Sequence, residues 1–152
     1  MLTGKLGHGS HGAVQGSTGG GHMPHLTIEY SENITGNIDI GALCVVMRDA
    51  MVETGIFPLG GIRVRAFPCQ TYVIADAAQD YGYLHMICRV GHGRDEPTRL
   101  AAADTLYSAA EAYLKPRMQR PFALSLDLDE LHPVTSLKRY NTIHAALAQT
   151  SA

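Results

Sequence analysis

The dipeptide Met23-Pro24 offers the most distinctive chemistry in this sequence. If Pro24 becomes the first residue, its nitrogen is a free secondary amine, a base that no other residue type supplies from its backbone. Such an amine can take and return a proton near neutral pH, because protein α-amines have reference pKa values of about 7.7–8.0. A proline that merely starts a strand, where its missing N–H does little harm, is the structural alternative. Pro24 is therefore a candidate for proton transfer.

The segment before this dipeptide, residues 1–22, is rich in glycine, serine and histidine and lacks the apolar stretch that a signal peptide requires. We expect it to be an expression leader, flexible like other Gly/Ser-rich segments. Its histidines form no evident ligand set, so no metal site is expected. We expect residues 23–152 to form a single domain. While the leader is attached, the Pro24 nitrogen is a planar amide and cannot act as a base.

Composition and charge exclude several classes of function. The net charge is -2, the pI is about 6.4 and no basic run occurs, so we expect neither nucleic acid nor an anionic membrane as a partner. We also expect no transmembrane segment. Cys44, Cys69 and Cys88 are odd in number and lack metal-site spacing, which favours reduced thiols in a cytoplasmic protein. With 17% charged residues and six methionines, the chain is expected to oligomerise.

The first half of the domain reads as a strand–helix–strand unit. Residues 24–30 alternate apolar and polar side chains, which predicts a half-buried strand. Residues 39–54 repeat apolar side chains at helical spacing. Residues 62–67 alternate again, and here Arg63 and Arg65 share the face opposite the apolar side chains.

The same order of elements is predicted in the second half. We expect a short pairing segment at residues 71–74, a strand at 81–90, a helix at 95–114 capped by its first residue, and a strand at 122–129. Residues 141–147 are expected to form a short helix or arm. The face of the long helix that we expect to contact the core carries Leu100, Ala103, Tyr107, Ala110 and Leu114.

Two units of nearly equal length imply a duplicated βαβ domain of the α+β class, an α/β two-layer sandwich. Parallel pairing inside each unit gives a four-stranded mixed sheet with both helices on one face. The other face would then be bare, and we expect it to be apolar and covered by further copies of the chain.

Six short motifs, in their order and spacing, carry a resemblance to a known family. They are Pro24-His25, residues 54–59 (TGIFPL) ahead of Ile62-Arg63, Asp80-Tyr81, His85-Met86, residues 91–94 (GHGR) and residues 130–133 (ELHP). Over essentially the whole of residues 23–148, the chain resembles the 5-carboxymethyl-2-hydroxymuconate isomerases of the tautomerase superfamily. The resemblance implies a tautomerase-like homotrimer that uses no cofactor and ketonises a dienol diacid in homoprotocatechuate breakdown.

The resemblance also implies roles for three residues. Pro24 would act as general base and then acid, Arg63 would stabilise the oxyanion or hold the 2-oxo acid end, and Arg94 would bind a distal carboxylate. Arginine suits both tasks because its planar fork binds a carboxylate bidentately and never gives up its own proton. Arg94 also precedes a predicted helix, whose N-terminus favours anions.

The other arginines and histidines are expected to have ordinary roles. We expect Arg65, Arg89 and Arg99 to be solvated or loosely paired at the surface, and His25 and His85 to be structural.

Two other functions stay open. One is a different tautomerase-superfamily activity, such as phenylpyruvate-type tautomerisation, decarboxylation or dehalogenation, since the same proline and arginines serve several chemistries. The other is a non-catalytic trimeric binding protein that retains the fold.

Overall fold

A computed structural model describes residues 23–151 of the chain. The expected leader, residues 1–22, lies outside the described residues. The elements in chain order are β1 (His25–Ser31), the 3-10 helix η1 (Glu32–Ile34), α1 (Ile40–Glu53), the 3-10 helix η2 (Leu59–Gly61), β2 (Arg63–Cys69), β3 (Gly82–Val90), α2 (Glu96–Leu114), β4 (Phe122–Glu130) and α3 (Ile143–Thr150).

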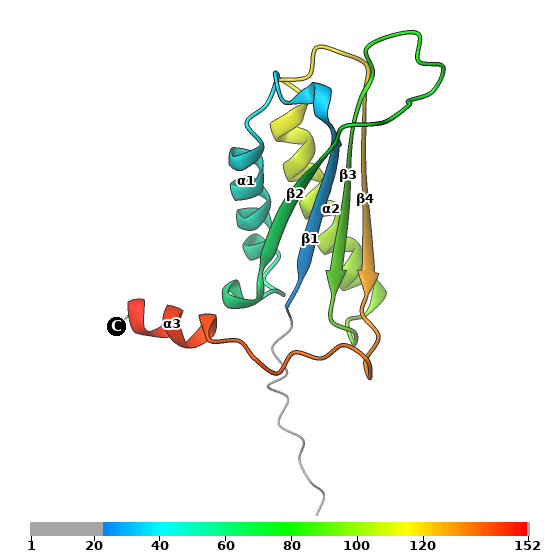
Figure 1. Cartoon of the computed structure of the whole chain (residues 1–152). Coiled ribbons are helices and arrows are strands. Elements are labelled where there is room, and N and C mark those ends of the chain that lie inside the picture. Colours follow the sequence, from blue (N-terminus) through cyan, green and yellow to red (C-terminus); the bar gives the residue numbers. More distant parts are fainter. Residues whose placement is uncertain (1–22, 152) are drawn as a thin grey trace, which may run out of the picture.

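The four strands form one sheet in the order β2-β1-β3-β4. Strands β1 and β2 are parallel, as are β3 and β4, while β1 and β3 are antiparallel neighbours at the centre. Helices α1 and α2 lie side by side on one face of the sheet, and α3 extends from one end (Figure 1). The predicted α+β fold with two βαβ units is therefore confirmed.

The core lies between the sheet and the two long helices. In β1 the side chains of Leu26, Ile28 and Tyr30 are buried, and β3 alternates in the same way. Asp39 and Asp95 begin the two helices, since the carboxylate of each accepts a backbone N–H bond of 2.9 Å in the first turn. Alternating strands and capped helices thus form the elements that the sequence indicates.

The buried face of α2 agrees with the predicted one at Ala110 and Leu114 but differs from it in the first half of the helix. Leu100 is 68% exposed, so the prediction that it contacts the core is wrong. The helix carries two apolar stripes, and the sequence pattern does not tell which of them meets the sheet. The stripe that is buried in the structure consists of Ala102, Leu106, Ala110 and Leu114.

The pairing segment predicted at residues 71–74 is not a strand, and Val73 is 83% exposed. The chain turns here instead, because Ala75 and Ala77 adopt positive φ angles of 50° and 56°.

The face of the sheet that carries no helix is polar, so our expectation of an apolar face is wrong. Most apolar side chains of the strands point toward α1 and α2, and the alternate positions outside are mainly polar, with Phe67 and Ile87 as apolar exceptions. The polar side chains on this uncovered face include His25, Thr27, Glu29, Arg65, Tyr83, His85, Arg89, Ser125 and Asp127.

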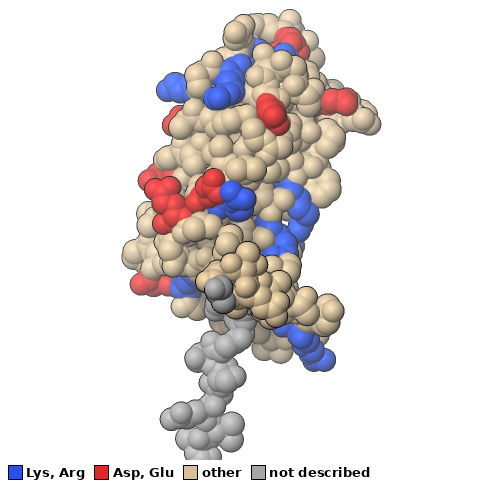
Figure 2. Space-filling model, turned by 90° about the vertical axis from the view of Figure 1, so that its left-hand side faces the viewer, with Lys and Arg blue, Asp and Glu red and all other residues tan. Residues whose placement is uncertain are grey.

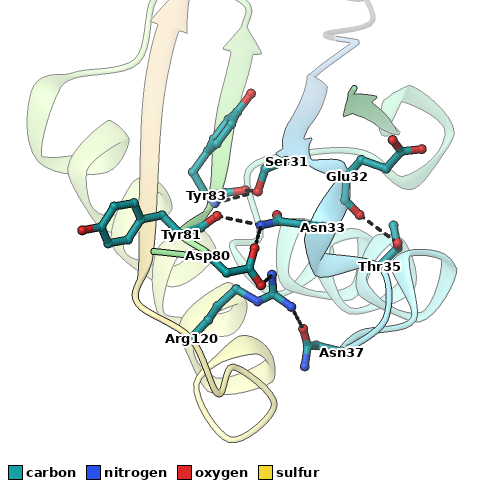
Figure 3. Close-up of polar contacts among 9 residues, drawn as sticks. All are labelled: Ser31, Glu32, Asn33, Thr35, Asn37, Asp80, Tyr81, Tyr83 and Arg120. Atoms are coloured by element: carbon teal, nitrogen blue, oxygen red, sulfur yellow. Dashed lines mark hydrogen bonds and ion pairs between the residues drawn. The ribbon is translucent and has the colours of Figure 1, made fainter. Parts of the chain in front are cut away.

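A polar network closes the end of the sheet where β1 stops (Figure 3). The side-chain amide of Asn33 donates to Asp80 Oδ1 at 2.8 Å and to the Tyr81 carbonyl at 2.7 Å. Arg120 bridges Asp80 Oδ2, at 2.5 Å, and Asn37 Oδ1, at 2.9 Å. Asp80 and Tyr81, two of the resembling positions, therefore join the ends of strands at the end of the sheet opposite Pro24.

Within residues 23–151, no helix is both long enough and apolar enough to cross a membrane. The three cysteines are free thiols. Over the same residues, no group of three or more His, Cys, Asp or Glu side chains is placed to hold a metal ion.

Candidate active site

Pro24 lies immediately before β1, with its ring fully buried. Its carbonyl oxygen accepts the backbone N–H of Arg63 at 3.0 Å, which extends the β1–β2 ladder by one residue. Its nitrogen is joined to Met23, whose Sδ lies 3.6 Å from the side-chain amide of Asn141. The sheet therefore fixes the position of the Pro24 nitrogen, whatever residue precedes it.

Arg63, the first residue of β2, turns its guanidinium back toward the preceding loop. Nη1 donates to the carbonyl oxygens of Gly60 and Ile62, at 3.0 and 2.9 Å. An arginine has five N–H donors, so these two bonds hold the side chain and leave the donors of Nη2 and Nε for a ligand.

Arg94 is held at the same end of the molecule. Its Nη1 donates to the Gly91 carbonyl at 3.0 Å and its Nη2 to the Ile56 carbonyl at 2.8 Å. The guanidinium carbon also lies 5.3 Å from the centroid of the Phe57 ring, a cation–π contact. Gly93 adopts a φ of +104°, which lets the loop turn before α2 begins.

One loop, residues 56–62, connects the two arginines. Arg94 donates to its first residue and Arg63 to its fifth, Gly60, while the backbone of Arg63 pairs with Pro24. The fold thus brings all three residues singled out from the sequence to one end of the sheet. This end can supply an amine, once it is free, and two guanidinium groups to an anionic substrate.

Glu130, at the end of β4, fixes the loop that carries Arg94. Its carboxylate accepts the Gly93 N–H at 3.0 Å and pairs with Arg99 on α2 at 2.7 Å. Arg99 is therefore a half-buried, paired residue rather than the loosely held surface arginine that we expected.

Both histidines selected from the sequence have polar partners. His85 Nδ1 lies 2.7 Å from the Ser125 hydroxyl, which fits the structural role that we predicted. His25 Nδ1 lies 2.8 Å from Arg65 Nη1. Burial first, and then the charges of Arg65, Arg63 and Lys138, lower the pKa of His25 from its usual 6.5.

Cys88 is close enough to Arg94 to feel its charge, but it is not a candidate nucleophile. Burial raises the pKa of its thiol to about 12, against the opposing effect of Arg94. The thiolate is the reactive form of cysteine, and it is negligible at such a pKa.

Three cations that lie near Pro24 are not among the site residues that the sequence predicts. Arg65, Arg89 and Lys138 line a cavity together with Met23. The sequence predicts Arg65 and Arg89 to be ordinary surface residues and assigns no role to Lys138. For Arg65 a signal existed, since it shares a strand face with Arg63. For Lys138 none did, because only the path of the chain after β4 places it there.

The amino-acid sequence is similar to known proteins over most of its length. The model of the 5-carboxymethyl-2-hydroxymuconate isomerase family matches residues 24–147. A protein of Escherichia coli named 5-carboxymethyl-2-hydroxymuconate Delta-isomerase is 36% identical over 124 residues, which cover 81% of this chain and 98% of that protein.

Solved structures of other proteins have a similar fold. A 5-carboxymethyl-2-hydroxymuconate delta-isomerase is similar with a TM-score of 0.76 at 35% identity, over 82% of this chain and 93% of the other. The corresponding isomerase of Deinococcus radiodurans R1 has a TM-score of 0.76 at 30% identity, over 84% and 96%. A fused 4-OT symmetric trimer, at 13% identity and a TM-score of 0.59 over 80% and 98%, shares the fold alone.

Proposed function

The chain belongs to the 5-carboxymethyl-2-hydroxymuconate isomerase family, and we propose that it ketonises a 2-hydroxymuconate-type dienol, with Pro24 as the group that moves the proton. The reaction is a 1,3-type proton transfer that needs no cofactor. As in the resembling family, it belongs to homoprotocatechuate breakdown.

The main support for this proposal is the residue at which the similarity to the family begins. The match to the family starts at Pro24, and the Escherichia coli relative is covered over 98% of its length. This supports Pro24 as the residue whose nitrogen is free in working enzymes. The buried ring and the ladder bond to Arg63 support it as well, because a base must be held rigidly.

In the proposed mechanism, the free amine of Pro24 removes the proton of the 2-hydroxyl group. The electron pair moves through the double bond, the C2–O bond becomes a carbonyl, and the Pro24 ammonium returns the proton to carbon. The amine ends the cycle uncharged, so it serves as base and then as acid in one turnover.

The two arginines bind the negative charge of the substrate and stabilise the negative charge that forms in the transition state. Negative charge builds on the C2 oxygen as the proton leaves, and Arg63 lies next to Pro24 in the ladder with donors still free. Arg94 binds a distal carboxylate with the donors that its loop bonds leave free.

The working form is proposed to be a cytoplasmic homotrimer. A threefold assembly is supported by the trimeric structure that shares the fold. The three free thiols support a reducing compartment. No observation favours another tautomerase-superfamily activity or a non-catalytic binding protein over this function.

The test is a substrate panel with protein that begins at Pro24. Ultraviolet assays should show ketonisation of 5-carboxymethyl-2-hydroxymuconate well above the solvent rate, and much slower reaction of the monocarboxylate phenylenolpyruvate. Faster turnover of phenylenolpyruvate would replace this proposal by a phenylpyruvate-type tautomerase.

A further inference from the structure

A cavity of about 470 Å³ lies on the uncovered face of the sheet, at the end where Pro24 enters β1. Side chains of β1, β2 and β3 form one wall, and residues 131–138, which follow β4, form the other. The volume falls in the range of about 300–1,000 Å³ that is usual for small-molecule sites.

Basic side chains dominate the polar lining of this cavity. They are His25, Arg65, Arg89 and Lys138. Among residues 23–151 neither the two arginines nor Lys138 has a carboxylate within ion-pair distance, in contrast to Arg99. Asp129 is the cross-strand neighbour of Arg89, yet no ion pair links them, and three cations that share one cavity produce a positive potential that favours an anion.

Two further observations agree with this potential. The pKa of His25 is lowered, in part because Arg65, Arg63 and Lys138 disfavour another positive charge. Viewed from the side of α1 and β2, most basic side chains at mid-height lie at the right, while the largest acidic cluster lies at the left with one basic side chain against it (Figure 2).

The cavity adjoins the proposed base. Met23 lines it, and the carbonyl carbon of Met23 is bonded to the Pro24 nitrogen. Removal of the chain through Met23 therefore opens the cavity toward that nitrogen. Ile87 and Leu137 add apolar surface, which suits the hydrocarbon part of a ligand.

The proposed substrate carries more negative charge than Arg63 and Arg94 can bind, so a further anion site is expected. A carboxymethyl group on a muconate diacid makes three carboxylates, and the proposed mechanism provides only Arg63 and Arg94 for them and for the oxyanion. We propose that this cavity binds carboxylate groups of the substrate, with Arg65, Arg89 and Lys138 as the residues that determine specificity for a multiply charged anion. This inference rests on the proposed function.

The kinetic test uses protein that begins at Pro24. Arg65→Gln, Arg89→Gln and Lys138→Gln should each raise KM about ten- to a hundredfold, as expected when a hydrogen bond between charged groups is lost, and leave kcat within about threefold. Arg89→Lys, which keeps the charge, should recover most of the loss. Arg139→Gln is the matched control, since Arg139 is exposed, adjoins Lys138 and does not line the cavity.

The binding test needs no turnover. Calorimetry with propane-1,2,3-tricarboxylate, a saturated anion that cannot ketonise, should show binding to the full 152-residue chain, weakened by salt. The Arg65→Gln/Arg89→Gln double variant, checked for folding by circular dichroism, should bind at least tenfold more weakly. Equal binding and unchanged KM in the folded variants would overturn the inference.

The two tests separate the inference from the function. Tricarboxylate binding that depends on Arg65 and Arg89, without turnover of any dienol, would retain the anion site and refute the isomerase. Turnover with KM values that are unchanged in the Arg65, Arg89 and Lys138 variants would retain the isomerase and refute the anion site.

Discussion

The imidazole ring of His144, on α3, occupies the space where a side chain on Gly60 would lie. A Cβ atom at position 60 would be 2.4 Å from His144 Nδ1, and the Asn141 side chain also donates to the Gly60 carbonyl, at 3.4 Å. Gly60 in turn accepts a bond from Arg63. The C-terminal helix is thus seated on the loop that holds a proposed active-site arginine.

Gly60→Ala should therefore displace α3 and destabilise the protein by about 1–3 kcal/mol, because overpacking forces the neighbours apart. The free energy of unfolding in urea measures the effect. In the double variant with His144→Ala the added methyl group has room, so the loss should be smaller than the sum of the two single losses. Simple additivity would show that the two residues are not in contact in solution.

The leader should block activity without preventing folding. With residues 1–23 attached, the Pro24 nitrogen is an amide whose lone pair is delocalised, while β1 and its ladder are intact. The full chain should be folded and nearly inactive, and cleavage that exposes Pro24 should restore ketonisation. The comparison is made at equal protein concentration, with mass spectrometry to verify the leader. Equal rates would exclude Pro24 as the base.

Replacement of the two proposed active-site arginines should change different kinetic parameters. Arg63→Ala should lower kcat by about two to three orders of magnitude, the usual loss for one oxyanion donor, about 2.7–4 kcal/mol. Arg94→Ala should chiefly raise KM, since a carboxylate held equally in ground and transition states contributes uniform binding. Arg48→Ala, at an exposed pair with Asp49, is the control. Wild-type kcat/KM in both variants would refute the assignments.

His25 should titrate below its usual pKa of 6.5, because of burial and then the charges of Arg65, Arg63 and Lys138. Arg65 can only donate to His25 Nδ1, which requires that nitrogen to be unprotonated. As pH falls the unfolded chain binds the proton first, so this stabilisation is full above about pH 6.5 and is lost as pH falls through the folded pKa. NMR titration should show the lowered midpoint, and Arg65→Gln should raise it. A midpoint at or above 6.5 in the wild type would contradict the structure.

The trimer should bury more than about 1,200 Å² at each interface, the lower end for stable specific contacts. Because the uncovered sheet face is polar, we expect much of the apolar contact to come from the chain after β4, where Val134 is 76% and Tyr140 is 87% exposed. Val134→Ser/Tyr140→Ser should shift sedimentation equilibrium toward monomers. Leu100→Ser, at an exposed position on α2, should not. A wild-type monomer at micromolar concentration would refute the trimer.

The sequence by itself determined the elements and their order, because these depend on short-range rules. Alternation in β1, the caps at Asp39 and Asp95 and the nearly equal length of the two βαβ units specify a sheet with two helices on one side. The unusual chemistry of Pro24 was also visible, since it depends only on a free secondary amine.

Only the tertiary structure decided which faces and side chains meet. The packing of α2 on the sheet decides which apolar stripe of the helix is buried. For this reason the prediction that Leu100 contacts the core is wrong. The cationic cavity depends on strand register, which pairs Thr27 with Arg65 and His25 with Arg89, and on the path of the chain that carries Lys138. No local pattern encodes a distance between residues so far apart in the chain, because such distances arise only when the strands pair.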